Sequence, residues 1–484
     1  MNPVTDSKEQ TEELNLPVSS REVLSGLPDG KVQQLEIQHG NGDLIRILTA
    51  LGIGGPFRST SPWELQDEQG RHLIHAGGYA ALPFGEAYPK LVAFVREYLE
   101  NGATLGFAQQ SASAWRAALE ANLVALVSHF APSHTDSQVF FSNSGAGAIE
   151  AALKFVRAAR PGSPVILNFG GAYHGKTFGA LSLTPNEEYQ GPFRPFHGDV
   201  RTVPFGDLLA LEQEIRSIGP EKIAAIFIEP IQGEAGVRLP PPEFLPGVYE
   251  LAQKHDILLI ADEIQTGLGR SGHWFASIAG GLEPDIITLA KPLSGGLVPI
   301  GATIARKELV TKLLGGMSSK RHSSTFGGGS LATAVALRSL EIIQEEGLVE
   351  RSRRLGRKGL HRLRKAQARH PRLLKDVRAS GMLFALELQG IVPPKAMNIQ
   401  QETLATMGSA LALRTLHKQG VHGCYSLNSA GVVRLTPALN IPEPLFDELF
   451  DRIDRFAQQN PQPWRMLTSL PTTRLPKLLR TLRS

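Results

Sequence analysis

Short apolar runs alternate with helical stretches between residues 138 and 305. The runs lie at residues 138–141, 164–168, 223–228, 257–261 and 285–289, and most are rich in Ile, Val, Leu and Ala. Strands that alternate with helices predict an α/β fold with a mostly parallel central sheet and right-handed crossovers. Polar motifs follow these runs, and ligands of such sheets bind beyond the carboxyl ends of the strands. The sequence therefore predicts a binding site at one edge of the sheet.

Outside residues 138–305, the apolar residues are spaced differently along the chain. Residues 21–50 show helical spacing, residues 62–78 read as a hairpin with its turn at 67–70, and residues 88–130 are again helical. Long helices rich in Arg and Leu are expected over 331–370, and mixed α/β structure over 380–455. We predict an N-terminal arm that packs with the small domain, a large α/β domain, a smaller α+β C-terminal domain and a basic tail, at residues 1–100, 101–345, 346–460 and 461–484.

Composition and charge exclude several classes of protein. A chain of 484 residues with 42% hydrophobic and 20% charged residues has a sizeable core and is not disordered in bulk. Lys plus Arg exceed Asp plus Glu by 50 − 46 = 4, but residues 461–484 carry five basic side chains and no acid, which leaves −1 on the remainder. Because the excess lies in the tail, we predict no nucleic-acid binding. Leu475, Leu478, Leu479 and Leu482 predict a short amphipathic helix there, packed on its own subunit rather than on a membrane.

Compartment and metal binding follow from the remaining features. The single cysteine, Cys424, fits a reducing compartment. No run of 18 apolar residues predicts a membrane-spanning helix, and the N-terminus shows no presequence. No metal-ligand motif is present. We therefore expect a cytoplasmic protein without a metal centre.

Three motifs at strand ends carry chemistry. Residues 141–154 read as a strand end, a turn of small residues and a helix start, which suits a phosphate group but is equally typical of a plain tight turn. Asp262 ends an apolar strand, where a buried carboxylate needs a cation or several donors. Lys291 ends the next strand before a Gly-rich turn, and burial there makes its amine a nucleophile toward carbonyls, although an exposed lysine is the plainer reading.

Together the three motifs match the needs of pyridoxal phosphate. This cofactor takes a lysine for a Schiff base, an acid beside its pyridine nitrogen and a helix N-terminus for its phosphate. No single motif supports that interpretation alone.

The residues also carry a family resemblance. From about residue 48 to 455 the chain resembles the class-III, fold-type-I pyridoxal-phosphate aminotransferases, a group that holds acetylornithine, ornithine, putrescine and 4-aminobutyrate aminotransferases. The run ADEIQTGLGRSG at 261–272 is specific to this class. Residues 170–300 are most similar to the putrescine branch, through the run YHGKT at 173–177 among others.

The resemblance implies roles for the residues of the three motifs. It makes Lys291 the Schiff-base lysine and the base for the proton shift. It places Asp262 against the pyridine nitrogen and Gln265 against the phenolic oxygen of the cofactor. Lys291 and Asp262 are thus the expected catalytic residues.

Further residues are implied to hold the phosphate and the ring. In the turn at Ser144, the amides of Gly145 and Ala146 are expected to bind the phosphate, and Tyr173 is expected to stack on the ring. Thr325 opens the run TFGGGS at 325–330, which in this class reaches the phosphate of the neighbouring subunit. The resemblance therefore implies a homodimer with a shared active site.

Substrate contacts are implied for three charged residues. Arg434 matches the arginine that grips a substrate carboxylate, which its planar fork suits. Glu234, in the run EPIQGE at 229–234, matches the acid that pairs with this arginine in ornithine and acetylornithine relatives when no α-carboxylate is bound. Lys176 replaces the arginine that those relatives use for a distal carboxylate, as in the putrescine branch. His174 is expected to order its loop.

Two further departures bear on the cofactor and the donor. Ala146-Gly147 stands where relatives usually have Thr-Glu, so a hydroxyl and a carboxylate near the phosphate turn are missing. The segment at 83–89 replaces the usual Gly-His before Pro, in a part of the family that lines the substrate entrance.

The sequence thus predicts a pyridoxal-phosphate aminotransferase. The expected donor is a diamine, an ω-amino acid or a related amino acid, and the expected acceptor is a keto acid such as 2-oxoglutarate. An amino-acid racemase, epimerase or aminomutase on the same scaffold would keep every cofactor residue. A catalytically silent dimeric scaffold is the third reading, and the intact Lys291, Asp262 and Gln265 argue against it.

Overall fold

A computed structural model describes residues 17–28, 30–101, 111–196, 198–390 and 401–469. By its internal contacts the chain divides into two compact units, Met1–Pro56 and Phe57–Ser484. The domain boundaries predicted at residues 100, 345 and 460 stay predictions.

Three short helices form the described part of the first unit, where the sequence predicts helical structure over 21–50. Helix α1 begins at a capping box in which Ser19 and Glu22 satisfy each other's backbone amides. Helix α3 is capped by the Asn41 side chain and ends at Gly52, whose φ of 69° is the left-handed conformation that glycine favours. The helices are α1 (Ser20–Ser25), α2 (Lys31–His39) and α3 (Gly42–Leu51).

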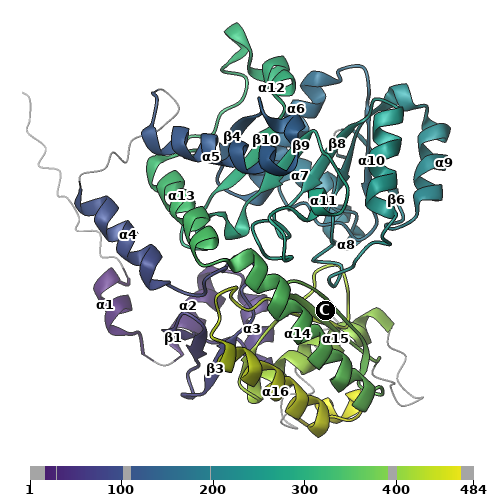
Figure 1. The fold of residues 1–484 in the computed structure, drawn as a ribbon. Coiled ribbons are helices and arrows are strands. Elements are labelled where there is room, and N and C mark those ends of the chain that lie inside the picture. The colour runs from purple at the N-terminus through teal and green to yellow at the C-terminus, as the bar shows by residue number, and fades with distance from the viewer. Residues whose placement is uncertain (1–16, 29, 102–110, 197, 391–400, 470–484) are drawn as a thin grey trace, which may run out of the picture. The chain divides into compact units, whose positions relative to one another are not determined.

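A seven-stranded sheet forms the centre of the second unit (Figure 1). The strands run in the order β4-β10-β9-β8-β7-β5-β6, and all are parallel except β10, which is antiparallel to both neighbours. They are β4 (Gln138–Ser142), β5 (Val165–Phe169), β6 (Asp199–Val203), β7 (Ile223–Ile228), β8 (Leu258–Asp262), β9 (Ile286–Leu289) and β10 (Gly301–Ala305). The predicted α/β fold with a mostly parallel sheet is confirmed.

Helices cover both faces of this sheet because its central strands are apolar on both faces. Every residue of β7 and β8 is buried. One core cluster joins the sheet to α6 and α12 through residues such as Phe155 and Leu309, and the other joins it to α9 and α10 through residues such as Leu211 and Phe244. The α-helices of the second unit are α4 (Pro89–Glu100), α5 (Ala114–Phe130), α6 (Gly145–Ala159), α7 (Phe178–Ser182), α8 (Glu187–Gln190), α9 (Leu208–Ile218), α10 (Phe244–Lys254), α11 (Ala276–Ala279), α12 (Lys307–Leu314), α13 (Ser330–Glu345), α14 (Leu348–Arg369), α15 (Gln401–Lys418) and α16 (Glu443–Gln459).

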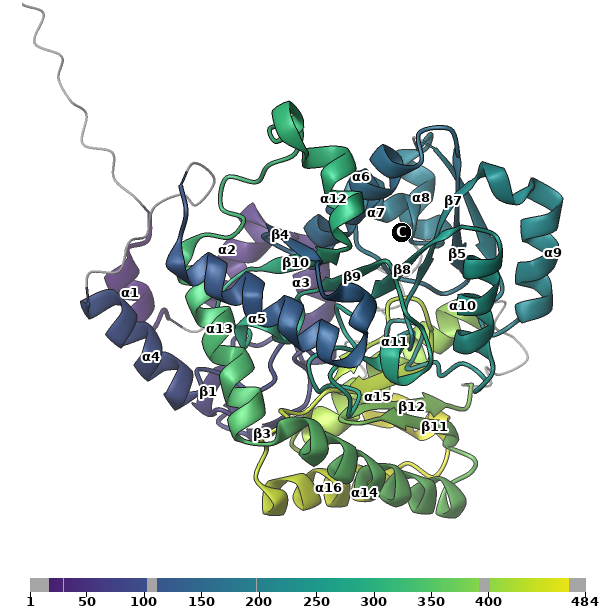
Figure 2. The same ribbon diagram turned by 45° about the horizontal axis from the view of Figure 1, so that its top comes forward.

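Two four-stranded sheets complete the second unit. In the order β11-β12-β15-β14, one sheet packs beside α14 and α16, as Figure 2 shows. The other, β1-β2-β3-β13, contains the hairpin predicted at 62–78, which is confirmed. The strands are β1 (Arg58–Ser61), β2 (Glu64–Gln66), β3 (His72–His75), β11 (Leu374–Ser380), β12 (Leu383–Leu388), β13 (Val421–His422), β14 (Cys424–Tyr425) and β15 (Val432–Leu435).

Short 3-10 helices connect these elements, and one of them carries Lys291. They are η2 (Pro132–His134), η3 (Gly191–Phe193), η4 (Pro220–Lys222), η5 (Lys291–Ser294), η6 (Gly316–Ser318) and η7 (Pro463–Ser469). The amphipathic helix predicted around Leu475 to Leu482 lies outside the described residues. Within the described part of the chain, no helix combines the length and the apolar character needed to span a membrane.

Candidate active site

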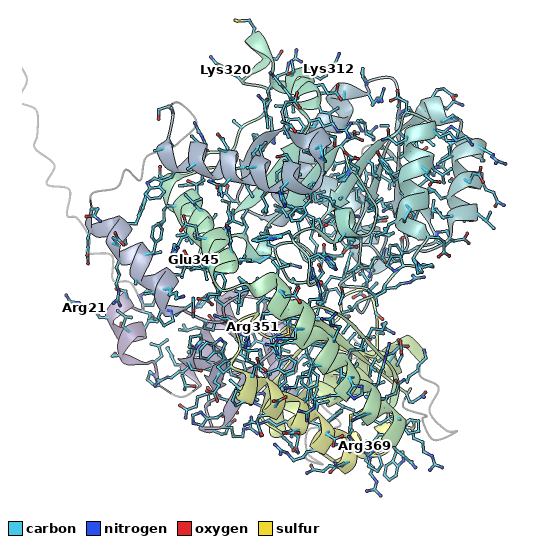
Figure 3. The ribbon with its side chains drawn as sticks, in the orientation of Figure 1. Arg21, Lys312, Lys320, Glu345, Arg351 and Arg369 are labelled. Atoms are coloured by element: carbon cyan, nitrogen blue, oxygen red, sulfur yellow. The ribbon has the colours of Figure 1, made fainter. Side chains whose placement is uncertain are left out.

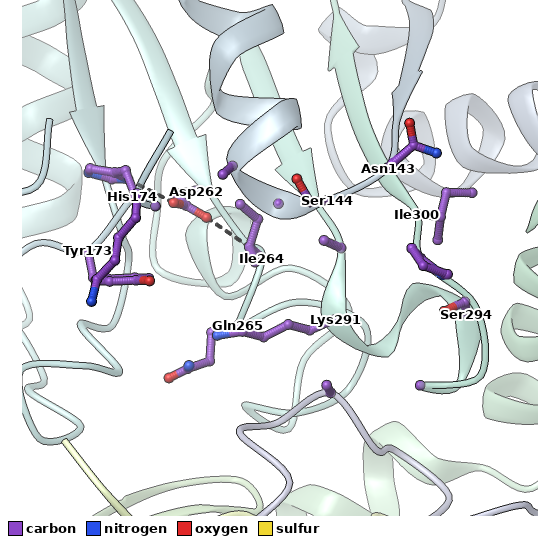
Figure 4. A pocket seen from close by; sticks show the side chains of 18 of the residues that line it. Asn143, Ser144, Tyr173, His174, Asp262, Ile264, Gln265, Lys291, Ser294 and Ile300 are labelled. Atoms are coloured by element: carbon purple, nitrogen blue, oxygen red, sulfur yellow. Dashed lines mark hydrogen bonds and ion pairs between the residues drawn. The ribbon is translucent and has the colours of Figure 1, made fainter. Parts of the chain in front are cut away.

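A cavity of about 500 Å³ opens where the carboxyl ends of the parallel strands meet. Figure 4 shows side chains from several of these strand ends around it, with Asp262, Gln265 and Lys291 among them. Each predicted motif contributes to its lining, which includes Ser144, Gly145, Ala146, Tyr173, His174, Lys176, Glu229, Glu234, Asp262, Gln265 and Lys291. The motifs that the sequence separates by up to 147 residues therefore share one site.

The turn at Ser144 prepares a helix N-terminus for an anion. The Ser144 side chain caps α6 by accepting a hydrogen bond of 3.0 Å from the Gly147 amide. Gly145 and Ala146 occupy the first helical turn, where amides have no acceptor within the helix. A Cβ on Gly301 of β10 would lie 2.2 Å from the Ser144 carbonyl oxygen, so this glycine allows the close approach of the strand. The turn lines the cavity and fits a phosphate group.

Asp262 ends β8 and is held by two donors. Its Oδ1 accepts a hydrogen bond of 3.0 Å from the Ile264 amide, and its Oδ2 lies 2.7 Å from His174 Nδ1 (Figure 4). The His174 side chain is fully buried, and its Nε2 has no hydrogen-bond partner. The sequence predicts only that His174 orders its loop. The structure adds a direct contact with the acid, because the loop after β5 crosses the end of β8.

A buried network joins Gln265, Glu234 and Arg434. Arg434 Nη2 donates to Glu234 Oε2 over 2.7 Å, and Arg434 Nη1 donates to Gln265 Oε1 over 3.0 Å. Gln265 Nε2 in turn donates to Glu234 Oε1 over 3.2 Å. Burial alone would raise the pKa of Glu234, but the charges of Arg434 and Lys291 and the hydrogen bonds from Gln265 and the Leu427 amide together lower it. The expected pairing of this acid with this arginine is thus present.

Lys291 follows β9 with a backbone φ of 28°, in a region that side chains other than glycine rarely adopt. Its side chain borders the cavity. Burial lowers the pKa of the Lys291 amine, and the three nearby carboxyl groups counteract this only in part. Such an amine is more readily available as a nucleophile than an exposed lysine.

Glu229 follows β7 and opens the run EPIQGE, which the resemblance includes, but no role was predicted for this residue. It is 6% exposed, lines the cavity, and its Oε2 accepts a hydrogen bond of 3.0 Å from the Tyr173 amide. Burial raises the pKa of Glu229 well above its ordinary value, and the charge of Asp262 adds to the effect. Its position directly after an apolar strand, like that of Asp262, is the signal that indicates a role at the site.

Lys176 lines the cavity, but its side chain rests on an aromatic ring. The Lys176 ammonium lies 3.8 Å from the centroid of the Tyr189 ring, and the Tyr189 hydroxyl donates to the Leu427 carbonyl over 3.2 Å. The Leu427 amide donates to Glu234 Oε2 over 3.2 Å. The two expected substrate cations, Lys176 and Arg434, are therefore connected through one chain of contacts. Tyr189 carries no motif that would have revealed it.

The remaining predicted residues lie at or beyond the edge of the cavity. Arg434 is fully buried behind Glu234 and does not line the cavity. Thr325 is exposed and does not line the cavity of its own chain. No residue of the segment 83–89 expected at the entrance is among those that line the cavity; Ala81, just before it, does line the cavity, and Phe84 is fully buried and packs near Gly295.

These residues fit the expected cofactor. A helix start with small residues, an aromatic residue and an acid at Tyr173 and Asp262, and the lysine Lys291 line one cavity. A Cβ on Gly175 would lie 2.7 Å from the Ala146 Cβ, so the loop of Tyr173 packs directly on the turn that fits the phosphate. Pyridoxal phosphate needs these three features on one site.

Comparison with known proteins agrees with this chemistry. The profile of the class-III aminotransferases matches residues 59–456. The aminotransferase PigE from Serratia sp. (strain ATCC 39006) is 38% identical over 349 residues, which make up 72% of this chain and 40% of PigE. The chain thus spans well under half of that relative's length.

Solved structures of transaminases share the fold. Ornithine aminotransferase from Toxoplasma gondii ME49 is 27% identical with a TM-score of 0.73, over 84% of this chain and 90% of that one. A transaminase from the marine bacterium Virgibacillus is 25% identical with a TM-score of 0.75, over 88% and 99% of the two chains. An amine transaminase from an uncultivated Pseudomonas species, solved in its PLP-bound form, is 24% identical with a TM-score of 0.75, over 84% and 95%.

Proposed function

Because the chain belongs to the class-III aminotransferases, which use pyridoxal phosphate, we propose that it transfers an amino group from a diamine, an ω-amino acid or a related amino acid to a keto acid such as 2-oxoglutarate. An amine donor and a keto-acid acceptor follow from the family. The choice among donors and acceptors is the proposal.

The pair between Glu234 and Arg434 carries this proposal. While Glu234 holds Arg434 at 2.7 Å, the guanidinium has no free charge for a carboxylate, so a donor that lacks an α-carboxylate meets no unpaired cation there. A keto acid takes the place of Glu234 on Arg434, which offers the planar, bidentate geometry that a carboxylate prefers. One pocket then admits an ω-amine in one half-reaction and a dicarboxylic keto acid in the other.

Residues around the cavity are proposed to hold and use the cofactor. Ser144, Gly145 and Ala146 hold the phosphate, Tyr173 covers the ring, and Gln265 binds the phenolic oxygen. Asp262, oriented by His174 at 2.7 Å, holds the proton of the ring nitrogen. When bound, the cofactor supplies a carbonyl group for the amine and a ring that withdraws electrons.

Lys291 is proposed to act twice. Burial lowers the pKa of its amine, which favours the uncharged form that would condense with the carbonyl group of the cofactor and release water. After a donor amine displaces it, the same amine accepts the proton from the substrate carbon and returns it at the neighbouring position. Loss of both functions by one substitution is expected to lower activity by orders of magnitude.

Lys176 and Thr325 complete the proposed site. Lys176 moves off the Tyr189 ring to meet the distal carboxylate of the keto acid. Thr325 and the exposed Phe326 are proposed to contact a second copy of the chain, so that Thr325 reaches the phosphate of the neighbouring site. The active form is then a homodimer.

A donor screen tests the proposed reaction. The purified protein is incubated with diamines, ω-amino acids and α-amino acids, each with 2-oxoglutarate or pyruvate, and glutamate or alanine is measured. We expect glutamate from a diamine or ω-amino acid, and only when 2-oxoglutarate is present. Conversion of an amino acid without any acceptor would point to a racemase or aminomutase and contradict the proposal.

A mixing experiment tests the shared site. Lys291→Ala and Thr325→Ala are inactive or impaired alone, but a refolded mixture contains hybrid dimers with one intact site. Activity above that of either variant is expected. A monomer in sedimentation experiments, or no gain on mixing, would overturn the homodimer.

A further inference from the structure

Three carboxyl groups line the same cavity, and only two have a charged or ring partner. Glu234 is paired with Arg434 at 2.7 Å, and Asp262 contacts His174 at 2.7 Å. Glu229 accepts one hydrogen bond, 3.0 Å from the Tyr173 amide. Among the described residues, none with a positive charge lies within ion-pairing distance of Glu229. Glu229 therefore differs from Glu234 and Asp262, because no basic side chain or imidazole ring of the described residues pairs with its carboxyl group.

The surroundings of Glu229 disfavour a negative charge. The side chain is 6% exposed, and the nearby charges come from separate elements: Asp262 at the end of β8, Glu234 in the loop after β7, and Lys291 on η5. The two acids repel a third negative charge, and the attraction of the Lys291 amine offsets only part of that repulsion and of the effect of burial. Burial and this repulsion together raise the pKa of Glu229 well above its ordinary value.

We propose that Glu229 is a positioning residue that works as a neutral carboxylic acid, with one oxygen accepting the Tyr173 amide and the other donating its proton to an anionic oxygen in the cavity. This inference rests on the proposed function, because the anionic oxygen belongs either to the cofactor, as its phenolic oxygen, or to the carboxylate of a bound keto acid. Both sources share one chemistry, an oxygen anion that accepts a hydrogen bond from a neutral donor.

The position of Glu229 connects it to the cofactor contacts. Tyr173, whose amide it fixes, directly precedes His174, and His174 contacts Asp262. Pro230 follows Glu229 and restricts the backbone that carries it. Glu229 therefore fixes the main chain that carries Tyr173 and His174. A substitution of Glu229 is expected to shift both Tyr173 and, through His174, Asp262.

Infrared spectroscopy of the full-length holoenzyme tests the protonation state directly. Difference spectra between the wild type and Glu229→Gln are recorded at neutral pH. We expect the wild type to show the C=O stretching band of a protonated carboxyl group that the variant lacks. Glu250→Gln is the matched control, because Glu250 is an exposed carboxyl on α10 outside the site, and its spectrum is expected to keep the band.

Kinetics of two variants test the positioning role. Glu229→Ala removes the acceptor of the Tyr173 amide, and we expect kcat/KM to fall about tenfold or more. Glu229→Gln keeps a carbonyl acceptor and a neutral donor, and is expected to restore most of that loss. The pH profile separates this role from a merely structural one: activity of the wild type falls as alkaline pH removes the Glu229 proton, and this limb is absent in Glu229→Gln.

The effect of Glu229→Ala on the absorbance spectrum and on KM shows whether the anionic oxygen belongs to the cofactor or to the keto acid. A changed absorbance spectrum of the resting enzyme assigns the cofactor oxygen, whereas an unchanged spectrum with a raised KM for 2-oxoglutarate assigns the keto-acid carboxylate. The proposal is overturned if the wild type lacks the protonated band, or if Glu229→Gln is as impaired as Glu229→Ala. A protein that transfers no amino group but shows the band would refute the proposed function and leave the neutral acid standing.

Discussion

Two sets of ion pairs in this protein use the same residue types in opposite environments. Glu234 and Arg434 are 4% and 0% exposed, and Glu234 lines the cavity while Arg434 lies buried against it. The other set joins basic residues of α14 to acidic residues of α16 on the surface, and ends at Arg369 and Asp454. Figure 3 labels Arg369 at the end of α14. In that last pair the side chains are 55% and 20% exposed.

The difference shows why counting ion pairs says little about their role. On the surface, water already satisfies each charge, so removing a partner costs little. In the cavity, removing either partner leaves a buried charge with nothing to meet it. The buried pair is thus suited to an exchange of partners, in which a substrate carboxylate replaces Glu234 on Arg434.

The largest expected difference between the two regions is in stability. Glu234→Ala leaves Arg434 buried with Gln265 as its remaining side-chain partner, and we expect the free energy of unfolding to fall by about 3–5 kcal/mol. Chemical denaturation of the wild type and the variant measures this. A double variant, Glu234→Ala with Arg434→Met, removes both charges and is expected to recover much of the loss while remaining unable to bind a keto acid. A loss within about 1 kcal/mol for the single variant would contradict a buried pair.

Acid pH gives a smaller and more specific difference. Burial acts to raise the pKa of Glu234, but Arg434 together with the other groups around it lowers that pKa. A hydrogen bond from Arg354 lowers the pKa of Glu443 on α16. For a lowered pKa the stabilisation is present above the unfolded value of about 4.3 and is lost as pH falls through the folded pKa. Unfolding free energy measured from pH 7 down is therefore expected to fall less steeply in Glu234→Gln and in Glu443→Gln than in the wild type.

Salt distinguishes the two carboxyl groups. Added salt at about 1 M screens exposed charges strongly and buried ones weakly. The contribution assigned to Glu443 is expected to shrink, and the contribution assigned to Glu234 to persist. Equal salt sensitivity of both would show that Glu234 is open to solvent.

The smallest expected effect on stability is at the last ion pair between α14 and α16. Arg369 and Asp454 are 2.7 Å apart, and a double-mutant cycle with Arg369→Ala and Asp454→Ala is expected to give a coupling of about 0.2–1 kcal/mol. Thermal or chemical denaturation of the four proteins measures it, with transamination unchanged throughout because neither residue lies near the cavity. A coupling of several kcal/mol would remove the contrast between the two regions.

The sequence predicted the strands that are apolar on both faces, because burial leaves a strong pattern. It predicted β7 with the bounds observed and β4, β5, β8 and β9 within a residue at either end. It missed β6 and β10. Strand β6 begins with Asp199, and β10 is a short run of small residues that follows a Pro-rich and Gly-rich turn, so neither stands out by hydrophobicity.

At the site, too, only residues with a local sequence pattern were predicted. Lys291, Asp262 and Gln265 were found because they follow strands or lie in a specific motif, and their roles stay proposals. Contacts between side chains far apart in sequence left no local signal. The pairing of His174 with Asp262 over 88 positions and the contact of Lys176 with Tyr189 depend on how loops cross the strand ends. Only the folded chain brings these groups together.

The account depends on Lys291 as the residue that carries the cofactor. Borohydride reduction of the purified holoenzyme, followed by peptide mass mapping, fixes the cofactor on the lysine to which it is attached. We expect the pyridoxyl label on Lys291 in the wild type, and no label with loss of the visible absorbance band in Lys291→Ala. A label on another lysine, such as Lys176, or a wild-type protein that carries no cofactor would contradict the account.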